Sequence, residues 1–138
     1  MMGKVGDVGE RYSYVLSVKE KFDSAHYLRG YPGKCAEVHG HTWEVEVAVE
    51  GRRLDGLGML IDLRILKRVL RDVIDLLDHK LLNDLSFFDP NPTVEVIGRW
   101  IFERVEERMK EMGEEIRLVY VKVSEGPSGY VTVLRRDL

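Results

Sequence analysis

Cys35-Ala-Glu-Val-His-Gly-His-Thr-Trp-Glu-Val-Glu-Val-Ala-Val-Glu50 joins the chain's only cysteine and two of its four histidines to a run of alternating residues. From Thr42 to Glu50, Trp43 and three valines alternate with polar or small side chains. This period of two is typical of a half-buried strand. The pattern therefore predicts a strand that begins directly after the pair of histidines.

A similar alternation upstream, from Tyr12 to Phe22, predicts a first strand. Between the two strands, Gly30, Pro32 and Gly33 interrupt the pattern. Residues 23–40 are therefore expected to form a loop.

Two later segments repeat apolar residues at helical spacing. Asp62 is the expected N-cap of the first helix, which should end near residues 78–82. Thr93 is the expected N-cap of the second helix, and Gly113 is its expected stop.

Two more strands are predicted, from about Ile116 to Ser124 and from Tyr130 to Arg135, around a turn at residues 125–129. The order β-β-α-α-β-β predicts an α+β fold, with one four-stranded antiparallel sheet and both helices on one face. The outer strands have neither prolines nor dense charge, so we expect their edges to pair with other copies in a closed homo-oligomer. Several apolar residues on the other face of the sheet would also need covering.

Composition favours one globular domain over residues 1–138, with residues 1–11 as a loose leader. The net charge of −3 argues against nucleic acid as a partner, and no apolar run is long enough to cross a membrane. The leader lacks an apolar signal core and one cysteine cannot form an internal disulfide, so a cytoplasmic location is expected. The chain has no glutamine and only two asparagines, a balance typical of heat-adapted proteins.

Three histidines lie close together in the sequence and predict a metal site. In an extended chain, His39 and His41 project to the same face, and His26 follows the neighbouring strand. Three neutral imidazoles suit Zn²⁺, and a fourth position open to water or substrate is typical of a catalytic zinc.

Cys35 lies four residues before His39, and two interpretations of it stay open. It could be a fourth ligand of a closed site. It could instead be a free thiol near the metal, where cationic surroundings lower the pKa of a cysteine.

Two acidic residues are further candidates. Asp78 precedes His79, and such a carboxylate can orient an imidazole as a general base, although the pair could also simply cap a helix. Glu125 could accept paired hydrogen bonds from a flat heterocycle, or it could be an exposed residue of a turn.

Five motifs in order resemble the 6-pyruvoyltetrahydropterin synthases and the 6-carboxytetrahydropterin synthases of the queuosine pathway. They are Phe22-Asp-Ser-Ala-His26, Cys35-x₃-His39-Gly-His41, Leu77-Asp78-His79-x₂-Leu82-Asn83, Asn91-Pro-Thr93-x-Glu95 and Ser124-Glu125-Gly. The resemblance covers nearly the whole chain. It implies the tunnelling fold, in which sheets join around a barrel in trimers that often stack as hexamers.

The resemblance also implies site roles. The three histidines would bind zinc, while Cys35, Asp78 and His79 would form the proton-transfer set. Glu125 would anchor the pterin ring with Thr93 near it, in active sites that lie between subunits. The implied substrate is 7,8-dihydroneopterin triphosphate, with Lys34 and Arg29 as candidate triphosphate contacts.

The product implied by the resemblance depends on the loop that holds Cys35. The short Cys-x₃-His-Gly-His spacing is similar to that of the carboxytetrahydropterin type, whereas the pyruvoyl type often has a longer gap. Some relatives use a glutamate in this loop for an aldolase-like cleavage to 6-hydroxymethyldihydropterin, and Glu37 lies two residues before His39. A non-catalytic module that binds zinc or a purine-type ligand on the same scaffold is the alternative from another class.

Overall fold

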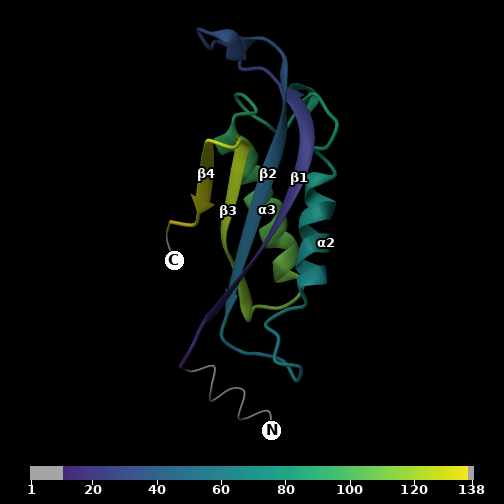
Figure 1. Cartoon of the computed structure of the whole chain (residues 1–138), viewed down its shortest axis with the longest axis vertical. Coiled ribbons are helices and arrows are strands. Elements are labelled where there is room, and N and C mark those ends of the chain that lie inside the picture. The colour runs from purple at the N-terminus through teal and green to yellow at the C-terminus, as the bar shows by residue number, and fades with distance from the viewer. Residues whose placement is uncertain (1–10, 137–138) are drawn as a thin grey trace.

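The computed structural model describes residues 11–136 as two layers, a sheet and a pair of helices (Figure 1). The expected leader therefore lies almost entirely outside the described residues. The strands and helices are β1 (Tyr14–His26), β2 (His39–Gly51), α2 (Leu63–Ile74), α3 (Val94–Lys110), β3 (Ile116–Gly126) and β4 (Gly129–Leu134). The strands form one sheet in the order β1-β2-β3-β4, and each neighbouring pair is antiparallel.

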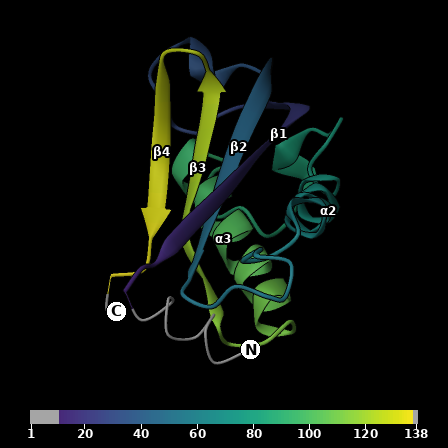
Figure 2. The ribbon, with the colours of Figure 1, turned by 60° about the horizontal axis from the view of Figure 1, so that its bottom comes forward.

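Both helices cover the same face of the sheet, as predicted (Figure 2). They begin at the expected caps, because Asp62 accepts the N–H of Arg64 and Thr93 accepts the N–H of Val96. Their apolar stripes pack on the alternating residues of the strands and form one core. Gly113 has a φ of +120° just past α3, which glycine adopts without strain. In residues 11–136, neither helix has the length and apolar character needed to span a membrane.

The opposite face of the sheet is more polar than expected. Lys19 pairs with Glu46 at 4.0 Å, and the Tyr120 hydroxyl donates to the same glutamate. Arg117 pairs with Glu50 at 2.8 Å. Several apolar side chains also remain exposed on the outer strands, among them Val15, Tyr130 and Leu134, and the expectation that they need covering stays a prediction.

The two long strands extend well beyond their predicted ends. β1 continues to His26 and β2 starts at His39, so residues 23–26 and 39–40 are strand rather than loop. His26 lies directly opposite His39 in the register. The true connection is residues 27–38, with one short turn of 3₁₀-helix at Lys34–Ala36.

α2 ends at Ile74, earlier than predicted, because the chain turns to run beside β1. His79 has a φ of +55°, and its N–H donates to the Asp23 carbonyl at 2.6 Å. The Ala25 N–H donates to the Lys80 carbonyl at 2.9 Å. At the other hairpin, β3 includes Glu125 and Gly126, so the predicted turn is shorter than residues 125–129.

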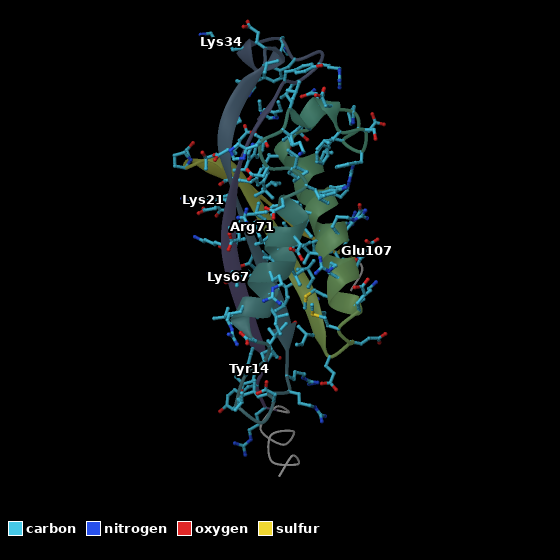
Figure 3. The ribbon with its side chains drawn as sticks, turned by 90° about the vertical axis from the view of Figure 1, so that its right-hand side faces the viewer. Tyr14, Lys21, Lys34, Lys67, Arg71 and Glu107 are labelled. Atoms are coloured by element: carbon cyan, nitrogen blue, oxygen red, sulfur yellow. The ribbon has the colours of Figure 1, made fainter. Side chains whose placement is uncertain are left out.

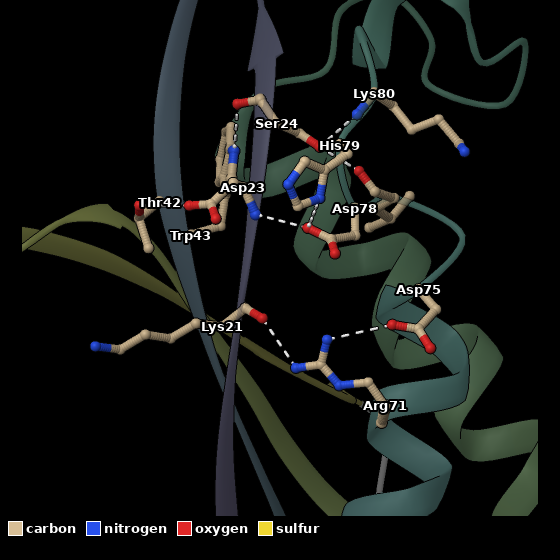
Figure 4. A network of polar contacts seen from close by, with 11 residues as sticks. Lys21, Asp23, Ser24, Thr42, Trp43, Arg71, Asp75, Asp78, His79 and Lys80 are labelled. Atoms are coloured by element: carbon tan, nitrogen blue, oxygen red, sulfur yellow. Dashed lines mark hydrogen bonds and ion pairs between the residues drawn. The ribbon is translucent and has the colours of Figure 1, made fainter.

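The free edge of β1 is therefore partly covered, which corrects the expectation of two unprotected edges. Besides the segment after α2, Arg71 donates to the Lys21 carbonyl at 2.9 Å. Arg71 also pairs with Glu20 and with Asp75. Figure 4 shows its contacts with Lys21 and Asp75, and Figure 3 shows its place on α2. The covered part is the half of the strand nearest to His26.

Candidate metal centre and proton-transfer groups

Three histidines converge at the end of the β1–β2 ladder, on the face that the helices cover. One ring nitrogen of each of His26, His39 and His41 lies within 4.8 Å of the others. Ring centroids are 4.6 Å apart for His26 and His39, and 4.8 Å apart for His39 and His41. The pairing of β1 with β2 creates this arrangement, because directly opposed residues and those two positions along share one face of a sheet.

Hydrogen bonds to backbone carbonyls fix the tautomers of two of these rings. Nδ1 of His26 lies 2.7 Å from the Pro92 carbonyl, and Nδ1 of His39 lies 2.7 Å from the Glu37 carbonyl. A carbonyl oxygen only accepts, so each Nδ1 carries the proton and each Nε2 presents a lone pair. Such an outer hydrogen bond is usual for histidines that bind a metal.

The lone pairs of this cluster fit a metal ion. Within residues 11–136, Nε2 of His26 and Nε2 of His41 are buried without a hydrogen-bond partner. Burial lowers the pKa of His26 below its ordinary value, although the Pro92 carbonyl and Glu125 act in the opposite direction. His26 is 1% exposed and is held neutral, the form that binds a metal. Buried, unpaired acceptors are costly, and a bound cation would satisfy them.

Trp43 packs against two of the three imidazole rings. Phe22 and Trp43 are stacked with centroids 5.8 Å apart, and Trp43 lies 4.9 Å from His26 and 5.3 Å from His41. The indole N–H donates to the Ser24 carbonyl at 3.0 Å, which fixes the orientation of Trp43. This packing limits the freedom of the histidine side chains.

Glu125 lies next to the histidines rather than in an isolated turn. One of its carboxylate oxygens is 3.7 Å from Nε2 of His26, and its side chain is 40% exposed. It occupies an irregularity in the pairing of β3 with β4, between Ser124 and Gly126. The carboxylate therefore faces both the cluster and solvent.

Asp78 and His79 form a second cluster with Asp23 on the edge of β1 (Figure 4). Nδ1 of His79 lies 3.1 Å from an Asp78 carboxylate oxygen, which also accepts the Asp23 N–H at 2.9 Å. The Asp23 N–H and, to a smaller extent, His79 hold the pKa of Asp78 below its ordinary value. The side chain of His79 is 78% exposed to solvent.

Cys35 belongs to neither cluster in the described part of the chain. It lies half-buried in the short 3₁₀ turn, where its carbonyl accepts the Leu28 N–H at 2.7 Å. The structure therefore brings three predicted ligands together without the cysteine as a fourth.

The other candidate residues have different surroundings. Thr93 uses its hydroxyl to cap α3, and Glu37 holds His39 through its backbone carbonyl. Lys34 is exposed at the far tip of the molecule (Figure 3), and the guanidinium of Arg29 lies 5.3 Å above the ring of Tyr27. No direct contact of these two cations with the histidines is found in residues 11–136.

Four residues at the site were not predicted to have a role: Pro92, Asp23, Asn83 and Asn91. Pro92 and Asp23 act partly through backbone groups, which no residue pattern indicates. The two asparagines carry a usable signal, because they are the only side-chain amides of the chain.

Comparisons with known proteins agree with this geometry. Residues 15–136 match the family model described as 6-pyruvoyl tetrahydropterin synthase. A 6-carboxy-5,6,7,8-tetrahydropterin synthase of Bacillus subtilis is 33% identical over 125 residues, which cover 86% of this chain and 84% of that protein. A dihydroneopterin monophosphate aldolase of Pyrococcus furiosus is 36% identical over 108 residues, which cover 78% of this chain and 86% of that protein.

The fold has a close match among solved structures. The 6-pyruvoyl tetrahydropterin synthase of Caenorhabditis elegans superimposes with a TM-score of 0.78 at 26% identity, over 91% of this chain and 97% of that one. Together with the family model and the two relatives above 30% identity, this match shows that the chain belongs to the 6-pyruvoyl tetrahydropterin synthase family.

Proposed function

We propose that this chain is a zinc-dependent lyase that acts on 7,8-dihydroneopterin triphosphate and forms 6-carboxy-5,6,7,8-tetrahydropterin, with loss of triphosphate and acetaldehyde. The observation that carries the proposal is the set of three converging histidines, two of which bury an unpaired Nε2. The curated relative from Bacillus subtilis, named for this product, supports the choice.

The metal would be held by His26, His39 and His41. Zinc bound there would supply a Lewis acid for the hydroxyl groups of the substrate side chain. The chain's own part is to orient His26 and His39 through the Pro92 and Glu37 carbonyls, so that each ring presents Nε2 to the ion.

Glu125 is the proposed anchor of the pterin ring. Its carboxylate can accept two parallel N–H groups from one edge of a flat heterocycle, as it does from a guanidinium. That carboxylate lies 3.7 Å from Nε2 of His26. A pterin ring anchored by Glu125 would therefore place the side chain of the substrate beside the three histidines.

His79 and Cys35 are the proposed proton-transfer groups. The Asp78 carboxylate accepts from Nδ1 of His79, so the lone pair of Nε2 points away from the acid and can take a proton from carbon. Cys35 as thiolate would move the second proton, in the loop next to His39.

The separation of Cys35 from the His79 cluster supports a site made by two copies of the chain. Within one copy, the exposed His79 ring lies on the edge of β1 and the thiol lies in the loop beyond the ladder. The part of β1 before Lys21 and the outer side of β4 remain as edges that can pair between copies. We propose a trimer, alone or stacked as a hexamer, in which one copy supplies the thiol and its neighbour supplies His79.

A second product is favoured by one specific observation. Glu37 lies in the same loop as Cys35, and the Pyrococcus furiosus relative is named an aldolase for a dihydroneopterin phosphate. If Glu37 rather than Cys35 acts as the base, the bond between the first two side-chain carbons would break, giving 6-hydroxymethyldihydropterin and a phosphorylated two-carbon aldehyde. Loss of turnover in Glu37→Gln with activity kept in Cys35→Ala would favour this route.

The proposal is tested by measuring metal content and triphosphate release together. We expect one zinc per chain and steady triphosphate release from the substrate. Cys35→Ala should keep the zinc but no longer release triphosphate. Loss of zinc in this variant would contradict the role of Cys35 as a free thiol. Tight pterin binding with unchanged substrate would instead indicate a non-catalytic binding module.

A further inference from the structure

Two asparagine side chains hold the backbone that follows β1. Asn83 accepts the Tyr27 N–H at 2.9 Å and donates to the Tyr27 carbonyl at 2.9 Å. Asn91 makes the same pair of bonds with Arg29, at 2.9 Å and 3.1 Å. Each amide thus acts like a residue of a neighbouring strand, and only an amide side chain offers both a donor and an acceptor in this geometry.

Both amides are themselves anchored to the helical layer. Asn83 lies in the short 3₁₀ turn Leu82–Asp84, beside the fully buried Leu82. Asn91 comes just before Pro92, whose carbonyl holds His26, and Thr93, which caps α3. The backbone after β1 is therefore positioned against the core.

The two held residues lie on either side of Leu28. The Leu28 N–H donates to the Cys35 carbonyl at 2.7 Å, and this bond joins the two sides of the loop. The amides therefore hold the two backbone neighbours of Leu28, and Leu28 is hydrogen-bonded to the backbone of the only cysteine in the chain.

We propose that Asn83 and Asn91 are positioning residues that set the place of the Cys35 thiol for proton transfer. This inference rests on the proposed function, because it requires Cys35 to act in turnover. Neither amide is a metal ligand or touches the three rings through a side-chain bond found in residues 11–136. The alternative is that the amides only cover the edge of β1.

A double-mutant cycle separates the two possibilities. Asn91→Asp keeps the size of the side chain but loses the donor, and it sets a carboxylate oxygen against the Arg29 carbonyl. We expect kcat to fall about ten-fold, as for a misplaced reactive group, with KM and zinc content unchanged. In a Cys35→Ala background, the residual rate of triphosphate release, measured at high enzyme concentration, should not fall further, because the two substitutions act through one group.

Alkylation of the single cysteine gives a readout that does not depend on turnover. Asn83→Asp and Asn91→Asp should each raise the rate of labelling by iodoacetamide about three-fold or more, because release of Leu28 exposes the thiol. Asp84→Asn is the matched control, since its exposed carboxylate neighbours Asn83 and should leave the rate unchanged. Either asparagine variant suffices if the other does not fold.

Two results would overturn the inference. One is an equal loss of kcat in the wild-type and Cys35→Ala backgrounds, which would mean that the amides act elsewhere. The other is a labelling rate that neither asparagine variant changes. If Cys35→Ala itself keeps full turnover, the proposed function of the thiol fails, and a raised labelling rate would still show that the amides control its position.

Discussion

Zinc should stabilise the folded protein through the three histidines of the cluster. A ligand that binds only the folded state adds about 2.7 kcal/mol to the free energy of unfolding at one hundred times its Kd. In a chain of this length, 1 kcal/mol shifts Tm by about 4 °C. We therefore expect Tm of the metal-free protein to rise by about 10 °C at that zinc concentration, measured by differential scanning fluorimetry.

The four histidines of the chain provide both the test and its control. His26→Ala removes a ligand and leaves the Pro92 carbonyl without its donor, which should lower the metal-free stability by about 1–3 kcal/mol. Because of that loss, each variant is compared with itself, with and without zinc. The zinc shift should disappear in His26→Ala and stay complete in His79→Ala, whose ring is exposed and lies outside the cluster.

A zinc-induced rise in Tm that survives in His26→Ala would contradict a metal site at these three histidines, since the ion would then bind elsewhere. Loss of the shift in His79→Ala would refute it equally, because the metal would depend on the other cluster. Calcium at the same concentration should leave Tm unchanged, because it prefers oxygen ligands to imidazole.

Three more predictions concern the second copy, acid stability and packing. Mixing inactive Cys35→Ala and His79→Ala proteins after partial dissociation should restore part of the turnover, and no recovery in verified mixed oligomers would contradict a site shared between copies. The lowered pKa of Asp78 stabilises the folded state above about pH 4, and this contribution is lost as the pH falls through that lowered pKa. Asp78→Asn should therefore weaken the pH dependence of the urea midpoint between about pH 2 and pH 5. An unchanged pH dependence would contradict this prediction. An added Cβ at Gly98 would meet Cγ2 of Val133 at 2.9 Å, so Gly98→Ala should destabilise by about 1 kcal/mol after the gain in helix propensity. In urea unfolding, Gly98→Ala should lower the free energy of unfolding by less in a Val133→Ala background than in the wild type. Equal losses in the two backgrounds would argue against this contact.

The strands and helices were predictable where apolar residues repeat, and their ends were less so. Ser24 and His26 continue the alternation of β1, but polar side chains on an inward face do not indicate a strand. The early end of α2 could not be predicted either, because apolar residues continue past it at helical spacing. Leu77 is buried and fits the helical stripe, although it already belongs to the segment that runs beside β1.

The cluster of three histidines could be predicted because histidine is scarce here and the spacing of His39 and His41 matches the pleat of a strand. Their partners could not, since the Pro92 carbonyl acts through the backbone from a position 66 residues after His26. The separation of Cys35 from His79 within one copy also could not be predicted from the residue pattern. Grouping them in one proton-transfer set followed from family resemblance, and within a single copy the two lie in separate places.

The most direct test of the proposed reaction is the mass of the pterin formed from 7,8-dihydroneopterin triphosphate by the zinc-loaded protein. We expect 6-carboxytetrahydropterin, with acetaldehyde and triphosphate released in equal amounts, and no product after chelation of the metal. Recovery of unchanged substrate, or of the same product from protein with His26 and His41 both replaced, would contradict it.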